Sequence, residues 1–159
     1  MNPLTLSVKR IVSGGQTGVD RGALDAAITV GIDHGGWCPR GRLAENGRIP
    51  ERYHLHEMDS SDYTVRTEQN VIDSNATLIL HVGTLSGGTE LTRRISVKHS
   101  RPHLLVDLAD NPDPHRVCQW LKDLSVEVLN VAGPRGSSLP GLAEEARDFL
   151  VQVFRDTMN

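Results

Sequence analysis

The feature that most constrains the fold is an apolar run that leads into two glycines and then into a segment of helical period. Residues 10–13 form the run, residues 14–18 the glycine turn, and residues 18–30 the helical segment. Glycines let backbone N–H groups approach a ligand closely, and a helix that begins there offers unpaired N–H groups and the positive end of its dipole. The pattern predicts a strand, a turn suited to an anion such as phosphate, and a helix.

Strand-like and helix-like segments alternate along the rest of the chain. Short runs rich in β-branched residues or leucine indicate buried parallel strands, and apolar residues recurring at three and four indicate helices. The alternation predicts an α/β fold whose parallel sheet is covered by helices on both faces. With 159 residues, the chain is expected to form one domain over residues 1–159. The expected strands are residues 10–13, 77–82, 103–108 and 126–131, and the expected helices are residues 18–30, 62–74, 89–99 and 142–154.

Two expected helices carry local signals. Thr17, followed three residues later by Asp20, resembles a capping box, in which side chains satisfy the first free N–H groups. In the helix over residues 89–99, Leu91, Ile95 and Val97 indicate the buried side.

Residues 33–61 break this rhythm, because they are rich in glycine, proline and arginine and show no clean period. We expect one short strand near residues 34–38, followed by a long loop. Loops of this length in compact domains are usually functional or disordered.

Composition excludes several classes of protein. The formal net charge of −3 gives no global attraction to nucleic acid or to an anionic membrane. No apolar run reaches the length of a membrane span, and the polar residues 1–5 do not form a signal peptide. Only Cys38 and Cys118 are present, so neither a disulfide framework nor a thiolate zinc site is indicated. We therefore expect a cytoplasmic protein.

Two further glycine turns, residues 86–90 and 133–137, also follow expected strands. Ligands of α/β sheets bind beyond the carboxyl ends of the strands, so all three turns are expected to open on one edge. A helix terminus contributes up to about 2 kcal/mol and a charge-assisted hydrogen bond about 1.5–3 kcal/mol, whereas micromolar binding needs about 8 kcal/mol. One turn alone can be purely steric, so a ligand that contacts several turns is favoured.

Charged side chains beside these turns are candidates to contact the ligand. Arg21 and Arg135 would oppose the helix dipole in a purely structural role, whereas a guanidinium matches an oxyanion with two hydrogen bonds. Asp20 and Glu90 are either capping carboxylates or acceptors for a ribose, a pterin or an amino group.

Other candidates come from the second expected helix and from the irregular segment. Arg66 and Asn70 lie four apart and share a helix face, which either reaches the ligand or faces solvent. Trp37 is suited to stack on a flat ring as part of the pocket wall.

The chain carries little sign of metal binding or catalysis. Cys38 is either a small buried hydrophobe or a metal ligand. His54 and His56 lie on one side of an extended segment, but no third ligand at a telling spacing supports a metal site. No Ser-His-Asp order, Cys-His order or carboxylate pair indicates covalent or acid–base catalysis, so no catalytic residue and no metal ligand is assigned.

The combined motifs resemble molybdenum cofactor carrier proteins, which belong to a larger Rossmann-like superfamily with lysine-decarboxylase-like, LOG and YpsA-type proteins. The resemblance implies a three-layer Rossmann-like fold, commonly assembled as a homo-oligomer such as a dimer or tetramer. It also implies a pocket for the molybdenum cofactor, a phosphorylated pterin that carries the metal through its dithiolene, and molybdate-like oxyanions fit part of such a pocket. The family is described as a circular permutation of the YpsA pattern, whose ligands are nucleotide-derived. The motifs span nearly the whole chain, at residues 14–27, 36–42, 66–71, 87–89 and 130–135.

Two functions follow from the resemblance, and a ligand sensor that signals to a partner is a third. The leading hypothesis is a binding and carrier protein for the molybdenum cofactor. The alternative is a nucleotide or nucleotide-sugar binding protein or hydrolase that acts through Glu90 or Asp20. LOG hydrolases carry a Pro-Gly-Gly-x-Gly-Thr-x-x-Glu motif, whereas here Glu90 follows Thr89 directly and the proline and third glycine are missing, which disfavours hydrolysis. The residues expected to bind the ligand are Gly14, Gly15, Gln16, Thr17, Gly18, Asp20, Arg21, Trp37, Arg40, Arg66, Asn70, Gly87, Gly88, Thr89, Glu90, Arg135 and Ser137.

Overall fold

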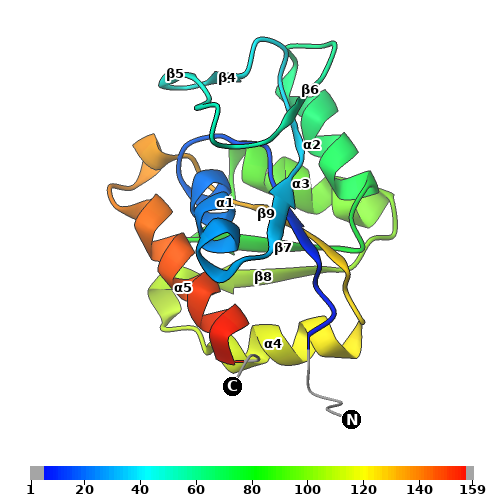
Figure 1. Ribbon diagram of the computed structural model, residues 1–159, viewed down its shortest axis with the longest axis vertical. Helices are drawn as coiled ribbons and strands as arrows, with labels where there is room; N and C mark the ends of the chain where they lie inside the picture. The colour runs from blue at the N-terminus through cyan, green and yellow to red at the C-terminus, as the bar shows by residue number, and fades with distance from the viewer. Residues whose placement is uncertain (1–5, 157–159) are drawn as a thin grey trace.

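Five parallel strands form the central sheet in the order β2-β1-β9-β7-β8 (Figure 1). The structure is a computed structural model that describes residues 6–156. The four expected strands over residues 10–13, 77–82, 103–108 and 126–131 belong to this sheet, with ends shifted by one or two residues. Of the short strand expected near residues 34–38, only the first part, β2, joins the sheet, at one edge. The strands are β1 (Arg10–Val12), β2 (Asp33–Gly35), β7 (Ala76–His81), β8 (His103–Asp107) and β9 (Val128–Ala132).

Helices cover both faces of the sheet, as the alternation of segments predicts (Figure 1). Helices α1, α4 and α5 share one large apolar cluster with the strands, and α2 and α3 pack together on the other face. Side chains along β7 alternate between the two faces of the sheet. Leu78 and Leu80 belong to the large cluster, whereas the Thr77 hydroxyl lies outside it and accepts a hydrogen bond from Asn130 Nδ2 (3.2 Å). The helices are α1 (Val19–Val30), α2 (Tyr63–Ile72), α3 (Gly87–Lys98), α4 (Pro114–Asp123) and α5 (Leu142–Asp156).

Three expectations about the helices need correction. Helix α4 was not predicted, although Val117 and Leu121 are buried and Asp113 caps its first turn. Val97 is 58% exposed, because it lies off the face of α3 that Ile95 buries. The capping box is also wrong: Gly18 precedes α1 with no side-chain cap, the Thr17 hydroxyl accepts from the N–H of Gly136, and the Asp20 carboxylate accepts from the N–H of Gln16.

The irregular segment is an ordered cap over one end of the sheet, not a structureless loop (Figure 1). Gly36 breaks the single expected strand into β2 and β3, because its φ is 123° and a Cβ there would lie 2.3 Å from the Ser13 carbonyl oxygen. The side chain of Arg42, only 5% exposed, ties the cap together by donating to the carbonyl oxygens of Pro50 and Tyr53, both at 2.8 Å. The short strands are β3 (Trp37–Cys38), β4 (Leu43–Ala44), β5 (Gly47–Arg48) and β6 (His56–Glu57).

Within residues 6–156, no helix is long and apolar enough to cross a membrane. Residues 1–5, expected not to form a signal peptide, lie outside the described part of the chain.

Candidate functional site

A pocket of about 520 Å³ opens where β1, β9 and β7 end, and residues from all three glycine turns line it. We call it the main pocket. The expected convergence of the turns on one edge of the sheet is confirmed, because their strands are adjacent and parallel. The predicted ligand-binding residues that line it are Gln16, Asp20, Arg66, Gly87, Gly88, Thr89 and Arg135.

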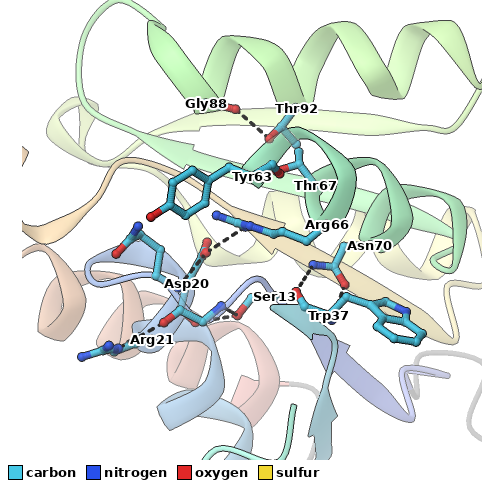
Figure 2. A network of polar contacts seen from close by, with 12 residues as sticks. Ser13, Asp20, Arg21, Trp37, Tyr63, Arg66, Thr67, Asn70, Gly88 and Thr92 are labelled. Atoms are coloured by element: carbon cyan, nitrogen blue, oxygen red, sulfur yellow. Dashed lines mark hydrogen bonds and ion pairs between the residues drawn. The ribbon is translucent and has the colours of Figure 1, made fainter. Parts of the chain in front are cut away.

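A buried ion pair forms part of the pocket floor. Arg66 Nη1 lies 3.4 Å from Asp20 Oδ2, and their side chains are only 14% and 5% exposed (Figure 2). Burial raises the pKa of the Asp20 carboxyl, and the positive charge of Arg66 opposes that shift. Gly14 makes room for this pair, since a Cβ at that position would lie 1.7 Å from Arg66 Nη1.

Two buried donors on the floor have no partner within residues 6–156: Gln16 Nε2 and Arg66 Nε. The orientation of the Gln16 amide is fixed, because its Oε1 accepts from the backbone N–H groups of Thr17 (3.0 Å) and Glu45 (2.9 Å). Its NH₂ group must therefore occupy the other position. A buried donor without an acceptor costs about 1–3 kcal/mol, so an acceptor supplied by water or by a ligand stabilises these two groups.

The second turn leaves open space at the start of α3. A Cβ at Gly87 or Gly88 would meet nothing within 4 Å, and Gly88 does not need the left-handed backbone that favours glycine. Glycine at position 88 therefore satisfies no steric need of the chain itself. The first N–H groups of a helix have no acceptor within it, so this part of the pocket is suited to an anion.

The third turn is held by a carboxylate of the chain itself. Ser137 donates from its backbone N–H (3.0 Å) and from its hydroxyl (2.6 Å) to Glu45, which lies just after β4 in the cap. Thr17 donates to the same carboxylate, and its hydroxyl oxygen accepts from the N–H of Gly136 (3.0 Å). The hydrogen bonds from Ser137 and then Thr17 lower the pKa of Glu45. Ser137 therefore already has an internal partner for both of its donors.

Gly18 joins the first and third turns. Its φ is 81°, and a Cβ there would lie 2.4 Å from the carbonyl oxygen of Pro134. Arg135 is the next residue after Pro134, and its half-exposed side chain lines the main pocket. Its Nη1 lies 3.8 Å from Glu45 Oε2.

Other predicted residues have partners outside the main pocket. Arg21 donates to the carbonyl oxygen of Gly15 (3.2 Å) and to Asn46 (3.0 Å), and Figure 2 shows it pointing away from Arg66. Glu90 faces its own helix, where the hydrogen bond from Arg93 lowers its pKa to about 2. Neither side chain is among the residues that line the main pocket.

Trp37 and Asn70 line a separate hollow of about 220 Å³. Asn70 bonds to the backbone N–H and carbonyl of Trp37, and the Trp37 indole N–H donates to Asp73 (2.8 Å). Arg40 is exposed in the cap. The structure thus does not bring these three residues to the main pocket.

Sequence reasoning missed Tyr63 and His81, which line the main pocket. The Tyr63 ring, at the start of α2, lies 5.6 Å from the Arg66 guanidinium carbon, and Tyr63 is 39% exposed. Its spacing of three from Arg66 was a usable signal. His81 ends β7, and its Nδ1 lies 2.7 Å from the Gly83 carbonyl oxygen.

Among residues 6–156, no three His, Cys, Asp or Glu side chains are grouped as a metal site requires. His54 stacks on His34 with ring centres 5.1 Å apart, and His56 lies against Trp37. Cys38 is buried in a small apolar cluster, and burial raises the pKa of its thiol.

Comparison with known proteins shows which family the chain resembles. The model of the circularly permutated YpsA SLOG family matches residues 11–154. The chain is similar to a proposed molybdenum carrier protein from Syntrophus aciditrophicus SB, known from a crystal structure. The two are 44% identical with a TM-score of 0.88, over 94% of this chain and 96% of that chain. No curated protein matches the chain.

Proposed function

Because this chain belongs to the circularly permutated YpsA SLOG family, we propose that it binds and carries the molybdenum cofactor in the cytoplasm. The similar protein from Syntrophus aciditrophicus SB bears the name of a molybdenum carrier. The observation that carries the proposal is the pair of buried donors, Gln16 Nε2 and Arg66 Nε, at the floor of a 520 Å³ pocket. Pockets of this volume hold ligands the size of a cofactor.

The residues of the main pocket fit a cargo that has oxyanions at one end. The start of α3, with the open space at Gly87 and Gly88, offers N–H groups to a phosphate or a molybdenum oxyanion. Arg135 adds a positive charge and a guanidinium that matches an oxyanion geometrically. The cargo itself supplies the metal and its chemistry, and the protein binds and shields it.

The test is to purify the protein from a host that makes the molybdenum cofactor and to measure what it retains. We expect molybdenum by mass spectrometry and a pterin by fluorescence after oxidation, in comparable amounts. Native mass spectrometry of the same preparation reports the assembly, which we expect to be a dimer or tetramer.

Arg135→Ala is the matched variant for this test. We expect it to retain about tenfold less cargo, because it loses a charge-assisted contact of about 1.5 kcal/mol, while its melting temperature stays nearly unchanged. Arg147→Ala, at a half-buried arginine that pairs with Asp148 on α5, serves as the control that keeps the cargo. A wild-type protein that retains a nucleotide, with no molybdenum or pterin above background, contradicts the proposal and favours the nucleotide alternative.

A further inference from the structure

The floor of the main pocket combines a hydrogen-bond acceptor with donors. The hydrogen bonds to the Asp20 carboxylate, from the backbone N–H of Gln16 (3.1 Å) and from Arg66 (3.4 Å), both fall on Oδ2. A carboxylate has about four acceptor positions, so Asp20 keeps acceptor capacity for a ligand. Gln16, whose backbone N–H bonds to Asp20, also carries the buried donor Nε2, which has no partner within residues 6–156.

Charge separates this floor from the outer part of the pocket. Asp20 and Arg66 carry opposite charges 3.4 Å apart, so the net charge of the floor is close to zero. An oxyanion on the floor would lie against the Asp20 carboxylate, where repulsion opposes binding. The outer part, with the start of α3 and Arg135, is lined by no carboxylate side chain of residues 6–156. The floor therefore suits a neutral edge that places N–H groups next to a carbonyl.

An aromatic ring borders the same space. Tyr63 lines the main pocket, is 39% exposed, and has the Arg66 guanidinium carbon 5.6 Å from its ring centre. Figure 2 shows the Tyr63 ring next to Arg66 and near Asp20. A flat heterocycle stacked on such a ring gains about 0.5–1.5 kcal/mol beyond the area it buries.

We infer that Asp20, Gln16 and Tyr63 select the ring of the ligand, a flat heterocycle with the 2-amino-4-oxopyrimidine edge that pterins and guanine share. Asp20 accepts from the amino group and the ring N–H, and Gln16 Nε2 donates to the carbonyl. Adenine presents a ring acceptor where this edge presents an N–H, so it would face Asp20 with a lone pair. The inference rests on the proposed function and identifies which part of the cargo the floor binds.

Titration calorimetry with guanosine 5′-monophosphate, adenosine 5′-monophosphate, neopterin and inorganic phosphate tests this assignment. We expect the guanine nucleotide to bind at least about tenfold more tightly than the adenine nucleotide, as for bidentate readings of a base edge. Neopterin is expected to bind although it has no phosphate. Binding of neopterin more tightly than the guanine nucleotide, although it lacks a phosphate for the outer pocket, supports a pterin as the natural source of the edge.

Gln16→Glu is the sharpest variant, because it keeps the acceptor for Thr17 and Glu45 but replaces the Nε2 donor with an oxygen. We expect the preference for guanine over adenine to fall to about threefold or less. Tyr63→Ala should weaken both nucleotides and neopterin about fivefold and leave inorganic phosphate unchanged. Val65→Ala is its control, because Val65 is similarly exposed on α2 but does not line the main pocket.

Equal affinities for the guanine and adenine nucleotides overturn the inference. So does a Gln16→Glu variant that folds, as judged by circular dichroism, and keeps the full preference. Neither outcome touches the proposed function, which fails only if the protein from the cofactor-producing host retains no molybdenum and no pterin.

Discussion

The first and third glycine turns lie on the neighbouring strands β1 and β9, yet they differ in how their donors are satisfied. At the first turn, Gln16 Nε2 and the nearby Arg66 Nε are buried and have no partner in the described part of the chain, residues 6–156. At the third turn, both donors of Ser137 bond to Glu45, a residue 92 positions away. The difference teaches that a donor in a glycine turn stays available to a ligand only where the chain does not supply an acceptor for it.

The largest expected effect comes from breaking the contact between these two turns. Gly18→Ala introduces a Cβ about 2.4 Å from the Pro134 carbonyl oxygen at a φ of 81°. Because backbone cannot rotate away as a side chain can, we expect the free energy of unfolding in urea to fall by about 2–4 kcal/mol. Gly88→Ala, which meets nothing within 4 Å, should change it by less than about 0.5 kcal/mol. Equal losses in the two variants would contradict this assignment.

A smaller loss of stability is expected from removing the Glu45 carboxylate from the third turn. Glu45→Ala removes the carboxylate that Ser137 and Thr17 bind, and we expect stability to fall by about 1–3 kcal/mol. The freed donors should raise the affinity for inorganic phosphate, measured by calorimetry. Glu51→Ala is the control, since Glu51 is an exposed carboxylate of the same cap that pairs with Arg48. If Glu45→Ala binds phosphate no better than wild type, the two turns do not differ in the way we describe.

The smallest effect is expected at the second turn, where the Glu90 carboxylate accepts hydrogen bonds from arginines of its own helix, α3. The hydrogen bond from Arg93 lowers the pKa of Glu90 from 4.5 to about 2, so its stabilising contribution is complete above the unfolded pKa and is lost as the pH falls toward 2. Thermal unfolding of wild type and Glu90→Gln should therefore show a small difference at neutral pH that closes in acid. A difference independent of pH would show that Glu90 acts by packing instead of charge.

Much of the fold could be predicted because its signals are local. Apolar runs and helical periods located the strands and four of the five helices, while α4 was overlooked although Asp113, Pro114 and the spacing of Val117 and Leu121 are local signals of a helix. The segment around Arg42 was misjudged as a loop because a buried arginine that binds carbonyl oxygens leaves no periodic trace. For the site, Trp37 was the expected ring wall, but its contacts with Asn70 and Asp73 hold it in another hollow.

The sequence by itself determined where the strands end and where the glycine turns fall, and hence the edge at which a pocket opens. Those features depend on residues within a few positions of one another. Only the tertiary structure decided which donors remain free, because this depends on distant segments: Glu45 fills the third turn and fixes the amide of Gln16, and α2 brings Tyr63 and Arg66 to the floor. Hydrogen-bond partners are chosen by approach in space, and a pattern along the chain does not record that approach.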